Sequence, residues 1–236
     1  IRLSLVGSEM CIRDRAQIDL IAFYDNPVDI ADVPRYERLF RSVKLIREPQ
    51  RSTASYIQRI FDRSARFPKT AEQSWSPEMW RTIEDVIRQH SYEMVHLFGG
   101  VQVYEYLNLV REIPNVIVPY ESFSLWMERA VSAERNLMAR LAKLLQLRVV
   151  RNFESWMFSG YDRCVVLTER DAEVMRNLNK DLPLVVIPNG VDMDYFASTG
   201  YEADRPTLMF IGNYDYEPNL DAALRLTRDI FPRIKQ

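Results

Sequence analysis

Short apolar segments that alternate with helical segments are the feature of this 236-residue sequence that most constrains its fold. These segments are too short for buried helices, and many end near glycine, proline or asparagine, which is typical of buried strands. We expect strands at residues 18–24, 42–46, 94–98, 115–120, 163–168 and 184–188. Strands that alternate with helices predict an α/β fold with a Rossmann-like parallel sheet, whose ligands lie beyond the carboxyl ends of the strands.

The segments between the strands have helical periodicity. Pro77 is suited to open one of these helices, because a proline in the first turn sacrifices no hydrogen bond. A last strand, 207–212, precedes a helix for which Asn219 is a suitable N-cap. We expect the remaining helices at residues 33–40, 102–112, 129–160 and 169–178.

Composition and charge exclude several classes of protein. The formal net charge of -2 argues against a nucleic-acid-binding protein, because neutralising phosphates requires a basic excess. Cys11 and Cys164 are too few for a disulfide framework, and no cluster of metal ligands is visible. No apolar run reaches the roughly 20 residues of a membrane-spanning helix. We therefore expect a cytoplasmic protein with at most surface attachment to a membrane.

The expected helix at 129–160 is strongly basic on one face. Arg140, Lys143 and Arg148 belong to this face, and Glu134 is the single acidic residue between 129 and 151. An apolar stripe runs along the same helix and consists of Leu137, Leu141, Leu144, Leu145 and Val149. Two interpretations stay open: a helix packed on the core with a solvated basic face, or a docking surface for anionic lipid.

The sequence divides into four parts. Residues 1–15 resemble a translated sequencing adapter and are expected to be non-native, although a real strand within LSLVG is the alternative. An N-terminal domain is expected over 16–188. Glycine and proline in 189–206 indicate an interdomain linker, and 207–236 is expected to begin a C-terminal domain.

The most informative motif is VIPNGVDMDYF at 186–196, followed by a strand that ends in Gly212. Together they resemble the domain junction of retaining glycosyltransferases of family four, which have the two-domain GT-B fold. The resemblance implies that residues 16–188 form the acceptor-side domain and that 207–236 begin the donor-binding domain. It also implies a hinge formed by Asn189, Gly190 and Asp192. Gly190 permits a turn with positive φ, and the two polar side chains can bond the bent backbone.

The strand-loop-helix corner after the junction is the expected donor site. A helix N-terminus next to glycine suits an anion such as a nucleotide-sugar diphosphate. The candidate donor-binding residues are Gly212, Asn213 and Asn219. The loop carries no cation, whereas the commoner family pattern has an arginine and a lysine there to hold phosphate charge. Gly212 with Pro218, Asn219 and Asp221 looks most like the exopolysaccharide-type branch.

Glu121, in PYESFS at 119–124, is the candidate catalytic residue on the acceptor side. It matches the segment where the family places a histidine or aspartate at a strand end, and it would orient an acceptor hydroxyl or assist its proton loss. The family's pair of glutamates in the donor domain is expected beyond residue 236. The chain is therefore expected to be an inactive fragment.

The expected function of the intact protein is a retaining, hexosyltransferase-like transfer from a nucleotide-sugar donor to a glycan or lipid-linked acceptor, without a metal ion or other cofactor. Exopolysaccharide or cell-envelope biosynthesis at the inner face of the plasma membrane is the implied setting. Two alternatives stay open: a noncatalytic domain that binds acceptor or membrane, and a GT-B nucleotide-sugar epimerase.

Overall fold

The computed structural model describes residues 16–26, 30–31, 33–119, 121–191, 193, 196–197, 200, 207–214 and 217–234. The chain divides into two compact units, residues 1–191 and 192–236. The expectations for residues 1–15 and for Asp192 lie outside the described residues.

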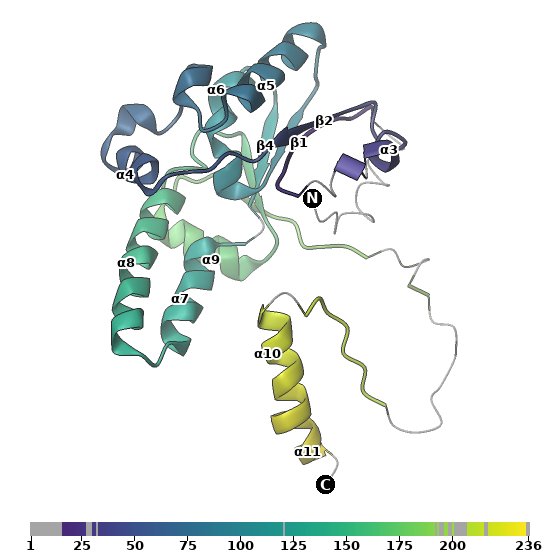
Figure 1. The fold of residues 1–236 in the computed structure, drawn as a ribbon, viewed down its shortest axis with the longest axis vertical. Helices are drawn as coiled ribbons and strands as arrows, with labels where there is room; N and C mark the ends of the chain where they lie inside the picture. Colours follow the sequence, from purple (N-terminus) through teal and green to yellow (C-terminus); the bar gives the residue numbers. More distant parts are fainter. Residues whose placement is uncertain are drawn as a thin grey trace. The chain divides into compact units, whose positions relative to one another are not determined.

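The strands of the first unit form two parallel sheets, in the orders β1-β2 and β3-β4-β5-β6 (Figure 1). Their bounds are β1 Asp19–Tyr24, β2 Ser42–Arg47, β3 Val95–Phe98, β4 Asn115–Val118, β5 Arg163–Val166 and β6 Leu184–Val186. In register, Asp19 pairs with Ser42, Val95 with Asn115, Val116 with Arg163, and Cys164 with Leu184. The Rossmann-like parallel α/β architecture predicted from the sequence is confirmed.

Helices and short 3₁₀ turns connect these strands. The helices are α3 Val33–Tyr36, α4 Thr53–Phe61, α5 Pro77–Gln89, α6 Leu107–Val110, α7 Phe123–Ala133, α8 Leu137–Glu154 and α9 Glu169–Leu178. Pro77 opens α5 as expected, and the Ser76 hydroxyl caps it by accepting from the Met79 N–H at 3.2 Å. The segment expected as one helix at 102–112 is mostly 3₁₀ turns, with only α6 as α-helix.

The expectation of one long helix over 129–160 is wrong, because the segment contains two helices. The backbone is extended at Glu134 and Asn136, between α7 and α8. The Asn136 side chain accepts from the N–H groups of Met138 and Ala139, both at 3.0 Å. This N-cap begins a new helix, so α7 and α8 form a helical hairpin (Figure 1).

In the second unit the helix is confirmed but the strand is not. Residues 207–213 have no regular secondary structure, although their apolar pattern predicts a strand. A strand needs a neighbour for its backbone hydrogen bonds, and none of the described residues supplies one here. Helix α10, Glu217–Arg225, begins before Asn219, so Asn219 lies inside the first turn instead of capping it. A π-helical turn, Leu226–Ile230, and α11, Phe231–Ile234, complete this unit.

A buried ion pair lies inside the core of the first unit. The Arg59 guanidinium contacts the Glu105 carboxylate at 2.7 Å, and the side chains are 4% and 1% exposed. Glu105 also accepts from the Trp75 backbone N–H at 3.1 Å, while Arg59 stacks over the Trp75 ring at 3.7 Å. Arg59 donates further to the Tyr104 hydroxyl at 2.9 Å. These contacts tie α4 to the segment before α5 and to the 3₁₀ turn Tyr104–Tyr106, which follows β3.

Candidate functional site

The carboxyl ends of the four parallel strands β3 to β6 lie along one edge of their sheet. After β3 the chain turns sharply at Gly99 and Gly100, whose φ angles are +123° and +47°. Side chains rarely tolerate these angles, so glycine is required at this turn. The Gly99 N–H donates to the Val118 carbonyl at 3.0 Å, which holds the turn against the end of β4. Glu121 follows β4 at this same edge.

Hydrogen bonds from α9 hold the segment that carries Glu121. The backbone N–H of Ser122 donates to Asp171 Oδ1 at 2.9 Å. The Thr168 hydroxyl donates to the other Asp171 oxygen, and the Asp171 N–H donates back to Thr168 at 3.1 Å. Thr168 is the N-cap of α9. Asp171 therefore connects the end of β4 to the end of β5.

The carboxylate of Glu154 holds the segment from the other side. It lies at the end of α8, is 1% exposed, and accepts from the N–H groups of Phe123 and Ser124, the latter at 3.2 Å. The Ser122 hydroxyl donates to it at 3.1 Å. Burial raises the pKa of Glu154, while these hydrogen bonds oppose that shift. Two carboxylates therefore fix the backbone immediately after Glu121.

Glu121 lies at the surface, but the surrounding protein shields part of its side chain from water, and this changes its pKa. Partial burial raises its pKa, and the nearby Asp171 carboxylate raises it further. Arg129 opposes both effects by favouring the charged form. A carboxyl group with a raised pKa, at the ligand edge of a parallel sheet, is suited to accept a proton from a bound hydroxyl.

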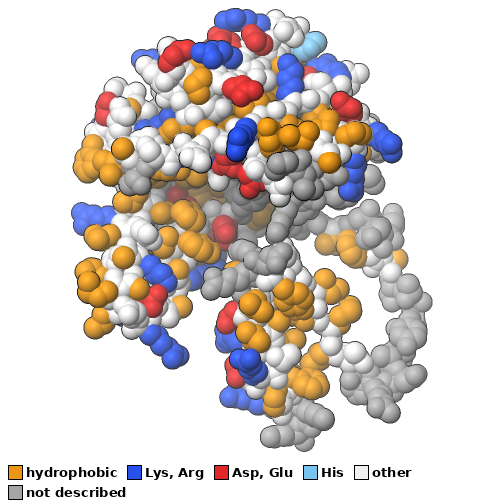
Figure 2. All heavy atoms as spheres, viewed as in Figure 1, with side chains coloured by type: hydrophobic (Ala, Val, Ile, Leu, Met, Phe, Trp, Pro, Cys, Tyr) orange, Lys and Arg blue, Asp and Glu red, His pale blue; other side chains and the backbone are white. Residues whose placement is uncertain are grey.

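The apolar stripe of α8 does not pack on the core. Its residues are exposed by between 43% and 80%, and they are Leu137, Leu141, Leu144, Leu145 and Val149. Figure 2 shows hydrophobic side chains gathered over the α7–α8 hairpin, at the lower left, with basic side chains among them. Arg140 and Arg148 are exposed, whereas Lys143 is bonded to Glu134 at 2.8 Å. The helix packs on the interior through Leu147 and Phe153, which are buried, while the stripe itself stays exposed.

The family profile described as Glycosyltransferase Family 4 matches residues 25–195. The chain belongs to glycosyltransferase family 4. The match covers most of the first unit, including the edge that carries Glu121, and all but the last residue of the motif at 186–196. No curated protein sequence matches the chain.

A solved structure that is similar to this family 4 chain is the complex of S. aureus MnaA with UDP. The two are 15% identical with a TM-score of 0.34, over 80% of this chain and 49% of the other. The family 4 chain therefore spans about half the length of that structure.

The predicted hinge residues of this family 4 chain follow β6. Asn189 and Gly190 are exposed and lie in irregular backbone. Gly190 does not adopt a positive φ, contrary to the expectation. A Cβ atom added to it would meet nothing within 4 Å, so the described chain has no tight turn there that requires glycine.

The predicted donor residues are neighbours within the second unit. Gly212 lies against the Asn219 side chain, since an added Cβ would be 3.2 Å from Asn219 Cγ. The Asn219 amide donates to the Asn213 carbonyl at 3.1 Å. A side chain at residue 212 would therefore push Asn219 away. The structure brings these three residues together as one corner.

Two further properties of the family 4 chain concern ligands and membranes. The described residues contain no group of three or more His, Cys, Asp or Glu side chains placed to hold a metal ion. None of the described helices is long and apolar enough to cross a bilayer.

The sequence predicted Glu121 but not the groups that hold its backbone. Asp171 and Glu154 lie 49 and 31 residues from the N–H groups of Ser122 and Phe123 that they bind. A local signal for Asp171 is present in the sequence, because Thr168 with Asp171 has the spacing of a capping box. That spacing predicts the cap of α9, and only the fold reveals its second contact.

Proposed function

We propose that this family 4 protein transfers a sugar, with retention of configuration, from a nucleotide-sugar donor to a glycan or lipid-linked acceptor. The observation that carries the proposal is the fixed position of Glu121 at the carboxyl edge of the family 4 sheet. In this proposal Glu121 orients the acceptor hydroxyl or accepts its proton as the new glycosidic bond forms. A hexosyltransferase in exopolysaccharide or cell-envelope biosynthesis fits this chemistry.

The donor is proposed to bind at the corner formed by Gly212, Asn213 and Asn219. Their position together at the start of α10 supports this role, because a helix N-terminus favours an anion such as a diphosphate. Residues 189–192 are proposed to be the hinge whose closure excludes water from the reaction. Metal-independent transfer is part of the proposal, because it relies on protein groups alone to stabilise the leaving diphosphate.

The complete gene product is expected to transfer radiolabelled sugar from a nucleotide-sugar panel to bacterial membrane extract, at a rate that excess EDTA leaves unchanged. The reason is that no step in the proposal uses a divalent cation. The measurement is label in acceptor with and without EDTA, followed by NMR of the product anomer.

Four outcomes contradict the proposal. An inverted anomer excludes retention, and loss of transfer in EDTA that Mg²⁺ restores excludes metal independence. Isomerisation of the nucleotide sugar without acceptor identifies an epimerase instead. A protein that binds the acceptor but neither transfers the sugar nor isomerises the nucleotide sugar is the noncatalytic binding domain given above as an alternative.

We also propose that the α8 surface attaches the protein to the anionic, cytoplasmic face of the plasma membrane. The exposed apolar stripe supports this, since contiguous apolar surface outside a core marks an interaction site. Arg140 and Arg148 add positive charge to the same helix. An amphipathic helix with apolar and cationic groups lies flat in an anionic lipid interface.

The chain is expected to float with vesicles that contain anionic lipid and to stay in solution with neutral vesicles. Replacing Arg140, Lys143 and Arg148 by glutamine should weaken binding to the anionic vesicles by on the order of 100-fold, since each basic residue near the surface contributes about 1 kcal/mol. Arg81→Gln, an exposed arginine on α5, is the matched control. If the triple variant floats with anionic vesicles as well as the wild type does, the α8 surface is not the membrane attachment site.

A further inference from the structure

Two aromatic side chains form a stacked pair at the start of α7, directly after the segment that carries Glu121. The ring centroids of Phe123 and Trp126 are 5.2 Å apart, and the ring planes are inclined by only 10°. The two residues are 47% and 38% exposed, although tryptophan is a residue that folded chains usually cover. Trp80 and Trp156, by contrast, are buried in the core. The pair therefore presents flat aromatic surface to the solvent.

The backbone that carries this pair is fixed. The Phe123 N–H donates to the buried Glu154 carboxylate, and the Trp126 N–H donates to the Ser122 carbonyl at 3.1 Å. The two aromatic residues are three positions apart in the helix, so they are neighbours on one face of it. A ligand that binds to rings already held together in this way orders few side chains and loses little entropy.

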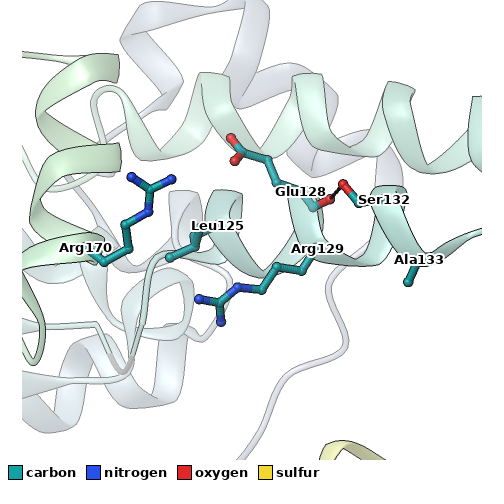
Figure 3. Close-up of a pocket in the computed structure, with 6 residues that line it drawn as sticks. All are labelled: Leu125, Glu128, Arg129, Ser132, Ala133 and Arg170. Atoms are coloured by element: carbon teal, nitrogen blue, oxygen red, sulfur yellow. Dashed lines mark hydrogen bonds between the residues drawn. The ribbon is translucent and has the colours of Figure 1, made fainter.

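Charged groups lie beside the stacked pair. Glu121 precedes it by two residues, and Arg129 follows Trp126 by about one helical turn. Burial raises the pKa of Glu121 and Arg129 lowers it, so the guanidinium and the carboxylate lie near each other. Figure 3 shows the Arg129 side chain and the Glu128 carboxylate on opposite sides of α7, and Glu128 is paired with Arg151 at 2.7 Å. The aromatic surface therefore has one hydrogen-bond acceptor and one hydrogen-bond donor close to it.

A pyranose ring has the chemistry that matches this surface. Its axial C–H groups form an apolar and slightly positive face, which is attracted by the negative face of an aromatic ring. Its hydroxyl groups both donate and accept hydrogen bonds, so they suit a carboxylate and a guanidinium equally. An anionic lipid fits less well, because the Glu121 carboxylate beside the pair would repel its headgroup.

We infer that Phe123 and Trp126 form a stacking platform for a sugar ring of the acceptor, with Glu121 and Arg129 next to its hydroxyl groups. The inference rests on the proposed function and narrows its acceptor to a glycan whose terminal sugar lies on the platform. The hydroxyl that receives the transferred sugar then belongs to that terminal ring, next to Glu121.

Saturation-transfer NMR of the full chain, with the methyl glycosides of glucose, galactose and mannose as probes, tests the platform. At least one glycoside should show saturable transfer that is strongest at the C–H protons of one ring face, and should shift the Trp126 indole N–H resonance. Trp126→Leu should weaken this binding by on the order of tenfold, because leucine is apolar but not flat. Trp126→Phe keeps a flat ring and should bind with intermediate affinity. Phe61→Leu, which removes an exposed ring from α4, is the matched control and should bind as the wild type does.

Two results of the glycoside titrations overturn the inference: no saturable transfer to any of the three glycosides, or equal binding by Trp126→Leu and Phe61→Leu. Circular dichroism establishes that the variants compared are folded. Vesicles of phosphatidylglycerol provide a further test. A shift of tryptophan emission to shorter wavelength that Trp126→Leu abolishes also overturns the inference, because the pair then contacts lipid.

The glycoside titrations contain no nucleotide-sugar donor, so their result is independent of transfer. Transfer by the complete gene product without glycoside binding would reject the platform and keep the proposed function. Glycoside binding without transfer would keep the platform as a sugar-binding surface and reject the enzyme.

Discussion

Glu105→Ala is expected to lower the free energy of unfolding by about 3–5 kcal/mol, since it leaves the buried Arg59 without its counter-ion. The loss includes more than one contact. The Trp75 N–H, which donates to Glu105 at 3.1 Å, also loses its acceptor in the protein interior. Because small domains are stable by only about 5–15 kcal/mol, this single change should remove a large part of the margin. Equilibrium denaturation in urea, followed by tryptophan fluorescence, measures it.

A surface ion pair of the same length provides the control for Glu105→Ala. Arg81 and Glu72 are also 2.7 Å apart, but their side chains are 59% and 70% exposed. Glu72→Ala should lower the stability far less than Glu105→Ala, because water screens the pair and solvates the remaining arginine. Equal losses for the two variants would contradict the role of burial. The double variant Arg59→Met/Glu105→Leu should recover stability relative to Glu105→Ala, because it leaves no buried charge unpaired.

The parallel fold could be predicted because each strand carries its own boundary signals. The segment that became β3 is apolar and ends at two glycines, and the structure places the strand end at Phe98, directly before them. The break between α7 and α8 was missed because the apolar and basic pattern continues across it. Asn136 acts there through its side chain, which periodicity does not detect. The strand expected at 207–212 is absent for another reason. A segment forms a strand only when a neighbouring strand pairs with its backbone, and the sequence of the segment alone does not show whether that neighbour is present.

The candidate site was predictable only in part. Glu121 could be predicted as a candidate because it follows a predicted strand. Its raised pKa depends in part on Asp171, which is 50 positions away in the sequence and lies near it only because α9 packs there. The exposure of the α8 stripe was likewise undecided, because an apolar periodicity is the same whether a core or a membrane covers it.

Glu121→Gln is expected to reduce kcat for sugar transfer by about 10²–10⁴-fold, the usual contribution of a positioned proton acceptor. The amide keeps the size of the side chain but cannot take a proton. KM for the nucleotide-sugar donor should change little, because Glu121 is proposed to face the acceptor. Steady-state kinetics of the complete gene product give both parameters. Glu93→Gln, an exposed glutamate that precedes β3 at the opposite edge of the sheet, is the matched control and should behave as wild type.

The pH dependence distinguishes a proton acceptor from a residue that only shapes the loop. The active form of Glu121 is the carboxylate, so the rate should fall as the pH drops through its pKa, and burial with Asp171 places that fall at a higher pH than for an ordinary glutamate. Arg129→Gln removes a charge that lowers this pKa, so the fall should move to still higher pH. Asp171→Asn should move it to lower pH. Profiles that coincide in all three proteins would contradict the assignment, since a purely structural Glu121 gives no reason for opposite shifts.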